Sequence, residues 1–159
     1  MAEQRVGTAF DAHRLVAGRR LVLGGVTVPA EVGLDGHSDA DIVCHVLCDA
    51  MLGATALGDI GRLFPNTDEW RDAASLDLLA RVCTLAAGEG WRLVNADCMV
   101  VLQAPKIAVY VDEMRARVAE AMRSTSHRVS IRGTTTDGLG FTGRGEGAAA
   151  QAVVLVERD

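Results

Sequence analysis

Residues 33–68 read GLDGHSDADIVCHVLCDAMLGATALGDIGRLFPNTD, and they contain the clearest signals for the fold. Ser38 or Asp39 is a typical helix-capping residue, and the segment that follows has the spacing of a helix reaching about Leu57. Its apolar positions are Ile42, Val46, Met51 and Leu52. The residues before Ser38 are predicted to form a loop. Residues 58–68 are rich in Gly and Asp and look too irregular for a regular element.

On both sides of this helix the chain consists of strand-like and helix-like segments. Residues 5–14 are predicted to form a strand, and residues 20–29 a hairpin that turns at Gly24-Gly25. Six further segments follow: a helix at 75–87, a strand at 91–103, a helix at 108–123, a strand at 129–135, a glycine-rich loop at 138–147 and a strand at 148–156. This order predicts one domain, residues 1–159, with an α+β fold in which helices pack on one face of a mixed β-sheet.

The composition indicates a globular protein with an aliphatic core. Hydrophobic residues make up 49% of the 159 residues and aromatic residues only 4%, so Val, Leu, Ala, Ile and Met must fill the core. With 16 basic and 21 acidic residues the net charge is -5, and the basic residues form no cluster. We therefore expect no binding to nucleic acid.

The sequence carries no targeting or membrane signal. The N-terminus, MAEQRVGTAF, lacks the basic and apolar regions of a signal peptide, and no run approaches the ~18 apolar residues of a membrane span. Cys44, Cys48, Cys83 and Cys98 show no CxxC spacing and are expected to be buried as small apolar side chains. These features predict a cytoplasmic protein with reduced thiols and no membrane partner.

Asp11, His13 and His45 are candidate ligands of a divalent metal. Asp11 and His13 are two residues apart in a predicted strand, so their side chains point to the same face. With His45 from the predicted helix they provide three oxygen and nitrogen ligands, as in catalytic zinc sites that keep one position open. Spacing also allows a chance Asp-x-His pair and a histidine that is simply packed in the core.

Two carboxylates share the helical face of His45. Asp41, His45 and Asp49 are spaced i, i+4 and i+8, which is typical of a solvated stripe or of carboxylates that orient a ligand histidine. His37 precedes the same helix. It is either a surface histidine or a donor to an anion near the helix N-terminus.

A second polar cluster follows the strand predicted at 129–135. Thr134, Thr135, Thr136 and Asp137 offer three hydroxyls and a carboxylate next to glycines, which suits phosphate oxygens and a hard cation such as magnesium. A glycine-rich turn is the simpler interpretation. Lys106, the only lysine, could add a local positive charge. No arrangement for covalent catalysis is evident, which favours chemistry based on positioning and metals.

Several longer motifs occur in an order that resembles one enzyme family. They are FDAHR at 10–14, LGGVTVP at 23–29, the stretch 33–68, QAPK at 103–106 and TTTDGLGFTGRGEG at 134–147. Over nearly its whole length the chain thereby resembles the 2-C-methyl-D-erythritol 2,4-cyclodiphosphate synthases of the non-mevalonate route to isoprenoids.

The resemblance implies a metal-dependent lyase that is a homotrimer with active sites between neighbouring subunits. Its substrate would be 4-diphosphocytidyl-2-C-methyl-D-erythritol 2-phosphate, whose 2-phosphate attacks the β-phosphorus to give the cyclic diphosphate and CMP. The resemblance also implies zinc at Asp11, His13 and His45, and magnesium or manganese bridging the diphosphate near Asp137. A central cavity in the trimer would be able to hold an isoprenoid diphosphate.

Individual residues match positions with roles in that family. His37 and Thr135 match the pair that orients and polarises the phosphates in the transition state. Substrate-contacting positions are matched by Ser38, Asp59, Ile60, Gly61, Phe64, Pro65, Asn66, Thr67, Asp68, Leu102, Ala104, Pro105, Lys106, Ile107, Ala108, Thr134, Thr136, Phe141 and Arg144. Three residues depart from the family pattern. Asn66 stands where an acidic residue is usual, Asp137 where Glu is usual, and Gly138 where a basic residue is common.

Two other functions remain open at the level of the sequence. A zinc-dependent phosphohydrolase would use a metal-bound water as its nucleophile. A non-catalytic module would bind nucleotides or isoprenoid diphosphates without turnover.

Overall fold

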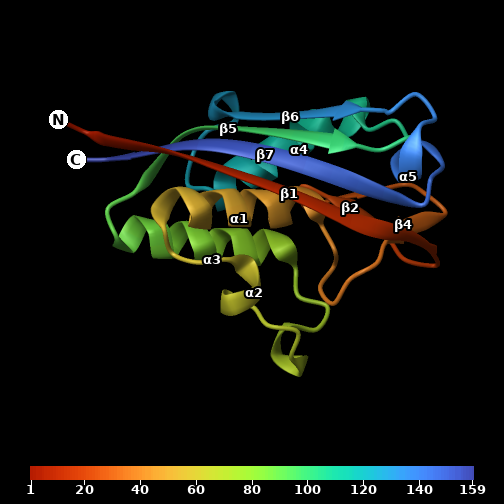
Figure 1. Cartoon of the computed structure of the whole chain (residues 1–159), viewed down its shortest axis with the longest axis horizontal. Helices are drawn as coiled ribbons and strands as arrows, with labels where there is room; N and C mark the ends of the chain where they lie inside the picture. The colour runs from red at the N-terminus through yellow and green to blue at the C-terminus, as the bar shows by residue number, and fades with distance from the viewer.

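A five-stranded β-sheet forms one layer of the molecule (Figure 1). The structure is a computed structural model that describes residues 1–159. The strand order is β4-β1-β7-β5-β6, with bounds Glu3–Ala17 for β1, Val32–Leu34 for β4, Arg92–Val101 for β5, Val129–Thr134 for β6 and Gly147–Arg158 for β7. β1 is antiparallel to β4 and β7, whereas β5 and β6 are parallel, so the sheet is mixed as predicted. A separate hairpin joins β2, Leu21–Leu23, to β3, Val26–Val28.

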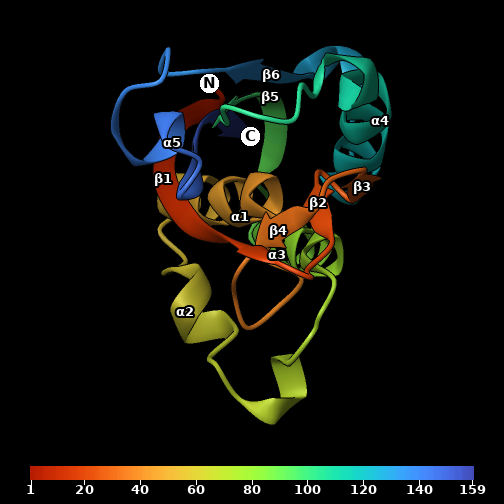
Figure 2. The same cartoon turned by 90° about the vertical axis from the view of Figure 1, so that its right-hand side faces the viewer.

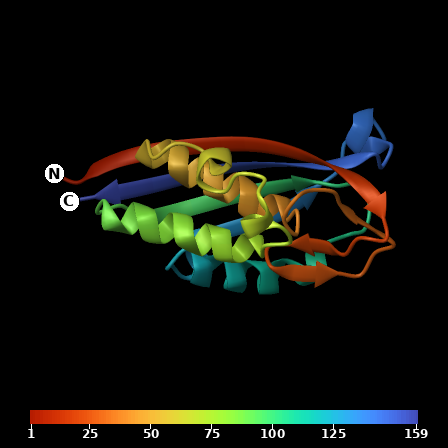
Figure 3. The same ribbon diagram turned by 90° about the horizontal axis from the view of Figure 1, so that it is seen from below.

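Three helices cover one face of this sheet (Figures 1 and 3). They are α1, Ile42–Thr55, α3, Ser75–Gly88, and α4, Val111–Ala121. The short helix α2, Ile60–Leu63, and the 3-10 turn η1, Asp68–Trp70, extend away from the sheet below α3 (Figure 2). The remaining short elements are η2, Ala108–Tyr110, η3, Ser126–Arg128, and α5, Gly140–Gly143. None of the helices has the length and apolar character needed to span a bilayer.

The strands alternate between buried and exposed residues because only one face of the sheet is covered. The residues of β7 that point toward the helices are all buried and apolar: Ala148, Ala150, Ala152, Val154 and Val156. Between them, Gln151 and Val153 are exposed on the opposite face. This alternation is typical of a sheet with one face packed and one face open.

α1 lies directly on the backbone of β1. A Cβ atom added to Gly7 would lie 1.9 Å from the carbonyl oxygen of Ala50 in α1, so only glycine allows this approach. In β1 the odd-numbered residues face α1, which puts Asp11 and His13 on the same side as His45. The predicted convergence of these three side chains therefore follows from the packing of one strand and one helix.

The start of α1 was predicted too early. Its N-cap is Asp41, not Ser38 or Asp39, and the Asp41 carboxylate accepts hydrogen bonds from the N–H groups of Val43 and Cys44. The helix ends at Thr55, because Ala56 takes the left-handed conformation with φ 58°.

Short elements occur where irregular chain was predicted. β4 lies in the loop predicted before α1, α2 in the segment 58–68, and α5 in the glycine-rich loop 138–147. α2 is held by contacts distant in sequence, since the N–H of Ile60 donates to the carboxylate of Asp49 in α1 at 2.8 Å. The helix predicted from residue 108 begins as the 3-10 turn η2 and becomes α4 at Val111.

Candidate active site

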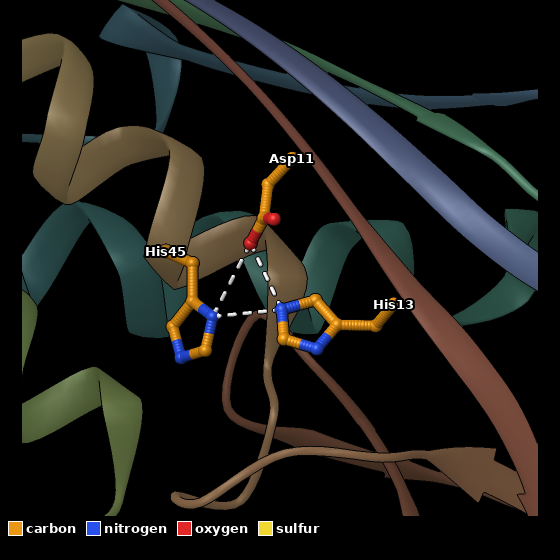
Figure 4. A group of neighbouring side chains, drawn as sticks. All are labelled: Asp11, His13 and His45. Carbon is orange, nitrogen blue, oxygen red and sulfur yellow. Dashed lines mark hydrogen bonds and ion pairs between the residues drawn. The ribbon is translucent and has the colours of Figure 1, made fainter. Parts of the chain in front are cut away.

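Asp11, His13 and His45 form one close group between β1 and α1 (Figure 4). His13 Nε2 lies 2.9 Å from Asp11 Oδ2 and 3.2 Å from His45 Nδ1, and His45 Nδ1 lies 3.5 Å from Asp11 Oδ2. One ligand atom from each residue thus lies within 4.8 Å of the others. All three side chains are partly buried. The arrangement fits a single small cation with one position left open to the adjoining cavity.

The hydrogen bonds of both imidazoles leave a lone pair directed at this group. His13 Nδ1 lies 2.6 Å from the carbonyl oxygen of Asp35, which accepts its proton, so Nε2 is free to bind a metal. His45 Nε2 lies 3.0 Å from Ser75 Oγ and 3.1 Å from Ser38 Oγ, so its Nδ1 is the atom that faces Asp11. The residues therefore fit a zinc ion in ligand type and in the direction of both rings.

Asp11 and the two histidines shift one another's charge states. The hydrogen bond that the Asp11 carboxylate accepts from the His13 imidazole raises the pKa of His13, and burial opposes that shift. Burial acts to raise the pKa of Asp11, but its interactions with the imidazoles of His13 and His45 outweigh that effect and hold the pKa of Asp11 far below its usual range. Asp11 is thus a permanent negative charge available to a cation.

A cavity of about 260 Å³ opens beside the two histidines. Six of the residues expected to contact substrate or phosphate line it: His37, Ser38, Ile60, Gly61, Phe64 and Asn66. Trp70 also lines it and packs edge-to-face on Phe64, with ring centroids 4.9 Å apart. Trp70 was not predicted to lie there, because it falls outside the motif at residues 33–68.

Residues 59–68, called the arm, form one wall of this cavity and contain four other expected residues. Asp59 caps α2 by accepting the N–H of Arg62, and Pro65 follows α2 directly. Asp68 pairs with Arg71 at 2.6 Å. The carbonyl oxygen of Thr67 accepts a hydrogen bond from His37 Nε2 at 2.6 Å, which holds the arm against the loop before α1.

A second cavity, of about 290 Å³, lies at the ends of β5 and β6. Its lining contains the expected residues Leu102, Pro105, Lys106, Ile107, Ala108, Thr134 and Thr135. Ala104 lies between Gln103 and Pro105 in the same loop, and the Thr136 hydroxyl bonds to Thr142 at 2.8 Å. The Thr135 hydroxyl donates to Asp137 at 3.3 Å, so the carboxylate proposed for a second metal stays near this cavity.

Within one chain the two cavities share no lining residue. His37 belongs to the first cavity and Thr135 to the second, and Asp137 is not part of the Asp11 group. Phe141 lines a third cavity of about 250 Å³ that also touches His13, and Arg144 pairs with Glu146 at 2.8 Å. A further cavity, of about 400 Å³, lies elsewhere, between α3 and the end of α4, and contains none of the expected site residues.

Comparison with known proteins gives this geometry a family context. Residues 4–157 match the YgbB family. The chain belongs to the YgbB family. It is 56% identical to the 2-C-methyl-D-erythritol 2,4-cyclodiphosphate synthase of Geobacillus kaustophilus, over 97% of this chain and 98% of that protein. The family resemblance seen in the motifs is thereby confirmed.

Solved structures agree with this assignment of the chain to the YgbB family. The bifunctional IspDF of Campylobacter jejuni is 37% identical, with a TM-score of 0.95 over 100% of this chain and 43% of that one. A 2C-methyl-D-erythritol-2,4-cyclodiphosphate synthase with bound CDP is 35% identical, with a TM-score of 0.87 over 96% of this chain and 99% of that one.

In this YgbB-family chain neither interpretation of the spacing of Asp41, His45 and Asp49 holds: Asp41 is fully buried, so the three form no solvated stripe, and the two carboxylates do not orient the imidazole. Asp41 and Asp49 do not contact its imidazole: Asp41 caps α1, and Asp49 accepts the N–H of Ile60. The imidazole instead contacts Ser38 and Ser75. The i, i+4 spacing did not bring the Asp41 carboxylate to His45, because Asp41 is the cap of the helix and its side chain turns back onto backbone N–H groups. No local pattern indicates Ser75, which is thirty residues from His45 in the chain.

Proposed function

We propose that this protein converts 4-diphosphocytidyl-2-C-methyl-D-erythritol 2-phosphate to 2-C-methyl-D-erythritol 2,4-cyclodiphosphate and CMP, in the synthesis of isoprenoid precursors. The observation that carries the proposal is the Asp11, His13 and His45 group beside a cavity that His37 and Ser38 line. Its relatives with this activity match almost the entire chain. Residues 1–159 would form one domain that carries this activity.

The reaction needs positioning and charge neutralisation rather than a protein nucleophile. An oxygen of the 2-phosphate attacks the β-phosphorus, the bond from that phosphorus to its bridging oxygen breaks, and CMP departs with the oxygen. Asp11, His13 and His45 would hold zinc, which when bound supplies a Lewis acid and a template for the phosphates. His37 would orient the phosphate on the same side of the cavity.

The nucleotide end of the substrate fits the second cavity. Lys106 gives it a positive charge, and the hydroxyls of Thr134 and Thr135 give it hydrogen-bond donors for phosphate oxygens. The backbone from Leu102 to Ala108 would enclose the cytosine. Asp137, whose carboxylate accepts a hydrogen bond from Thr135, would help to hold magnesium or manganese at the diphosphate, and that ion would neutralise phosphate charge.

A homotrimer would complete the site. His37 and Thr135 are proposed to act on one substrate but line separate cavities of one chain, so the second cavity of a neighbouring subunit would face the metal group. The Arg144–Glu146 pair sits in the loop before β7 and is a candidate entrance contact for an isoprenoid diphosphate in the trimer centre. Four buried, unpaired cysteines support a cytoplasmic location.

Product analysis with zinc-loaded protein tests the proposal. Cyclic diphosphate plus CMP is the expected result, and a ring-open product would instead identify a phosphohydrolase. His13→Ala is expected to lose zinc and turnover, while its affinity for CMP stays unchanged, because CMP lacks the β-phosphate proposed to lie at the zinc and the nucleotide cavity does not include His13. Binding of CDP without any turnover by the wild type would identify a non-catalytic module.

A further inference from the structure

We infer that Ser75 and Asp39 are positioning residues that fix the tautomer and orientation of His45 for metal binding. This inference rests on the proposed zinc site. The three side chains form a chain of hydrogen bonds that runs from a carboxylate through a hydroxyl to the imidazole. Neither Ser75 nor Asp39 lines the cavity beside the metal group, so both act through His45.

The direction of each hydrogen bond follows from the carboxylate. Asp39 is an acceptor, so the Ser75 hydroxyl donates its only proton to Asp39 Oδ1 at 2.5 Å. The Ser75 oxygen then has only lone pairs for His45 Nε2, at 3.0 Å. His45 must therefore carry its proton on Nε2, which leaves the Nδ1 lone pair for a metal.

Ser38 cannot impose this tautomer by itself. Its oxygen lies 3.1 Å from His45 Nε2 and accepts the N–H of Ala40 at 3.1 Å. Its proton has no carboxylate partner, so Ser38 could equally donate to an unprotonated Nε2. Ser38 also lines the cavity beside the metal group and is available to substrate there. Only Ser75 combines contact with His45 and a proton committed to a carboxylate.

The chain of hydrogen bonds is shielded and rigid. Ser75 is fully buried, so water does not compete for its hydroxyl. Asp39 Oδ2 also accepts the backbone N–H of Ser75 at 3.1 Å, which fixes the carboxylate through both oxygens. Ser75 is the first residue of α3, whereas His45 lies in α1, so the packing of two helices sets the angle of the ligand ring.

A purely structural role makes a different prediction. Ala74, the N-cap of α3, has no capping side chain, and Asp39 supplies that bond from outside the helix. If the bonds between Asp39 and Ser75 served only to stabilise the start of α3, loss of the Ser75 hydroxyl would lower stability and leave zinc affinity unchanged. The positioning role instead predicts weaker zinc binding at a given stability.

Zinc affinity of the purified metal-free protein is the deciding measurement, made by competition with a chromophoric chelator. Ser75→Ala and Asp39→Asn are each expected to weaken zinc binding by about 10- to 100-fold, the range for loss of a hydrogen-bond partner of a ligand histidine. The visible spectrum of the cobalt-substituted protein should shift in both variants. The double variant should lose little more than Ser75→Ala, because both changes break the same chain.

Two matched variants separate positioning from folding. Thr55→Val also removes one buried hydroxyl, which bonds to the Met51 carbonyl at 2.8 Å far from the metal group, and should lower stability without changing zinc affinity. Ser75→Thr keeps the hydroxyl and should restore most of the affinity lost in Ser75→Ala. Unchanged zinc affinity and cobalt spectra in Ser75→Ala and Asp39→Asn, with turnover of the wild type intact, would overturn the inference and leave the proposed function standing. A wild type that binds no zinc overturns both.

Discussion

Asp41 is a fully buried carboxylate that joins the hairpin to the start of α1. One oxygen accepts the N–H groups of Gly24 at 2.9 Å and Val43 at 3.1 Å, and the other accepts that of Gly25 at 2.7 Å. Burial raises the pKa of Asp41, and the backbone donors oppose that shift. Without this carboxylate several buried donors would have no partner, so Asp41 stabilises two elements at once.

Asp41→Ala is therefore expected to lower the free energy of unfolding by about 3 kcal/mol, the combined effect of a lost cap and unpaired buried donors. Asp59→Ala is the matched control, because Asp59 also caps a helix by accepting the N–H of Arg62 but is exposed. It should cost about 1 kcal/mol or less. Urea unfolding of the metal-free variants measures both. Equal losses would show that the contacts of Asp41 with the hairpin contribute nothing.

The four cysteines should be inert toward thiol reagents in the folded protein. Burial raises the pKa of Cys83 and of Cys98 to about 12, and it raises those of Cys44 and Cys48 well above their usual range. With a pKa near that value, the thiolate fraction at about pH 8 is on the order of one in ten thousand. A colorimetric disulfide reagent should therefore detect no fast thiol before denaturant is added, and all four afterwards. One rapidly reacting thiol in the native protein would contradict this burial.

The contact of β1 with α1 decides whether the three metal ligands lie close together. Gly7 is expected to tolerate no side chain, because a Cβ there would collide with the carbonyl oxygen of Ala50. Gly7→Ala should lower the free energy of unfolding by about 3 kcal/mol and weaken zinc binding, since α1 must move away from β1. Gly53→Ala, also in this region but with no atom within 4 Å, should instead stabilise α1 by about 0.5 to 1 kcal/mol. Unfolding and zinc titration of both variants test the argument, and similar behaviour of the two would contradict it.

Sequence patterns could predict the elements and ligands that depend on local spacing. Asp11 and His13 lie two apart on one strand, and the pattern placed them on the same face correctly. The hydrogen bonds that run from Asp39 through Ser75 to His45 could not be predicted, because Ser75 reaches His45 only through the packing of α3 on α1. Short elements such as β4 and α2 were missed for the same reason, since three or four residues carry too little periodic signal and are fixed by distant partners.

On the scale of the whole molecule, one face of the sheet lacks a covering layer. Val6 and Phe10 of β1 are each 67% exposed there, and Val153 of β7 is 41% exposed. Apolar side chains gathered on an open face favour association with other copies of the chain. The expected homotrimer would bury this face and would bring the nucleotide cavity of one subunit to the metal group of the next.

Phe10→Glu should therefore break the trimer, because it places a charge on the face that the subunits would bury. The mass in solution, measured by light scattering, should fall to that of a single chain while circular dichroism remains that of the folded protein. Leu85→Glu is the control: Leu85 is also 40% exposed but lies on α3, away from the open face, and this variant should keep the trimer. Turnover should disappear with the trimer, since His37 and Thr135 would then reach no common substrate. A single-chain form of Phe10→Glu with full turnover would show that one subunit contains a complete site, and would refute the arrangement proposed between neighbours.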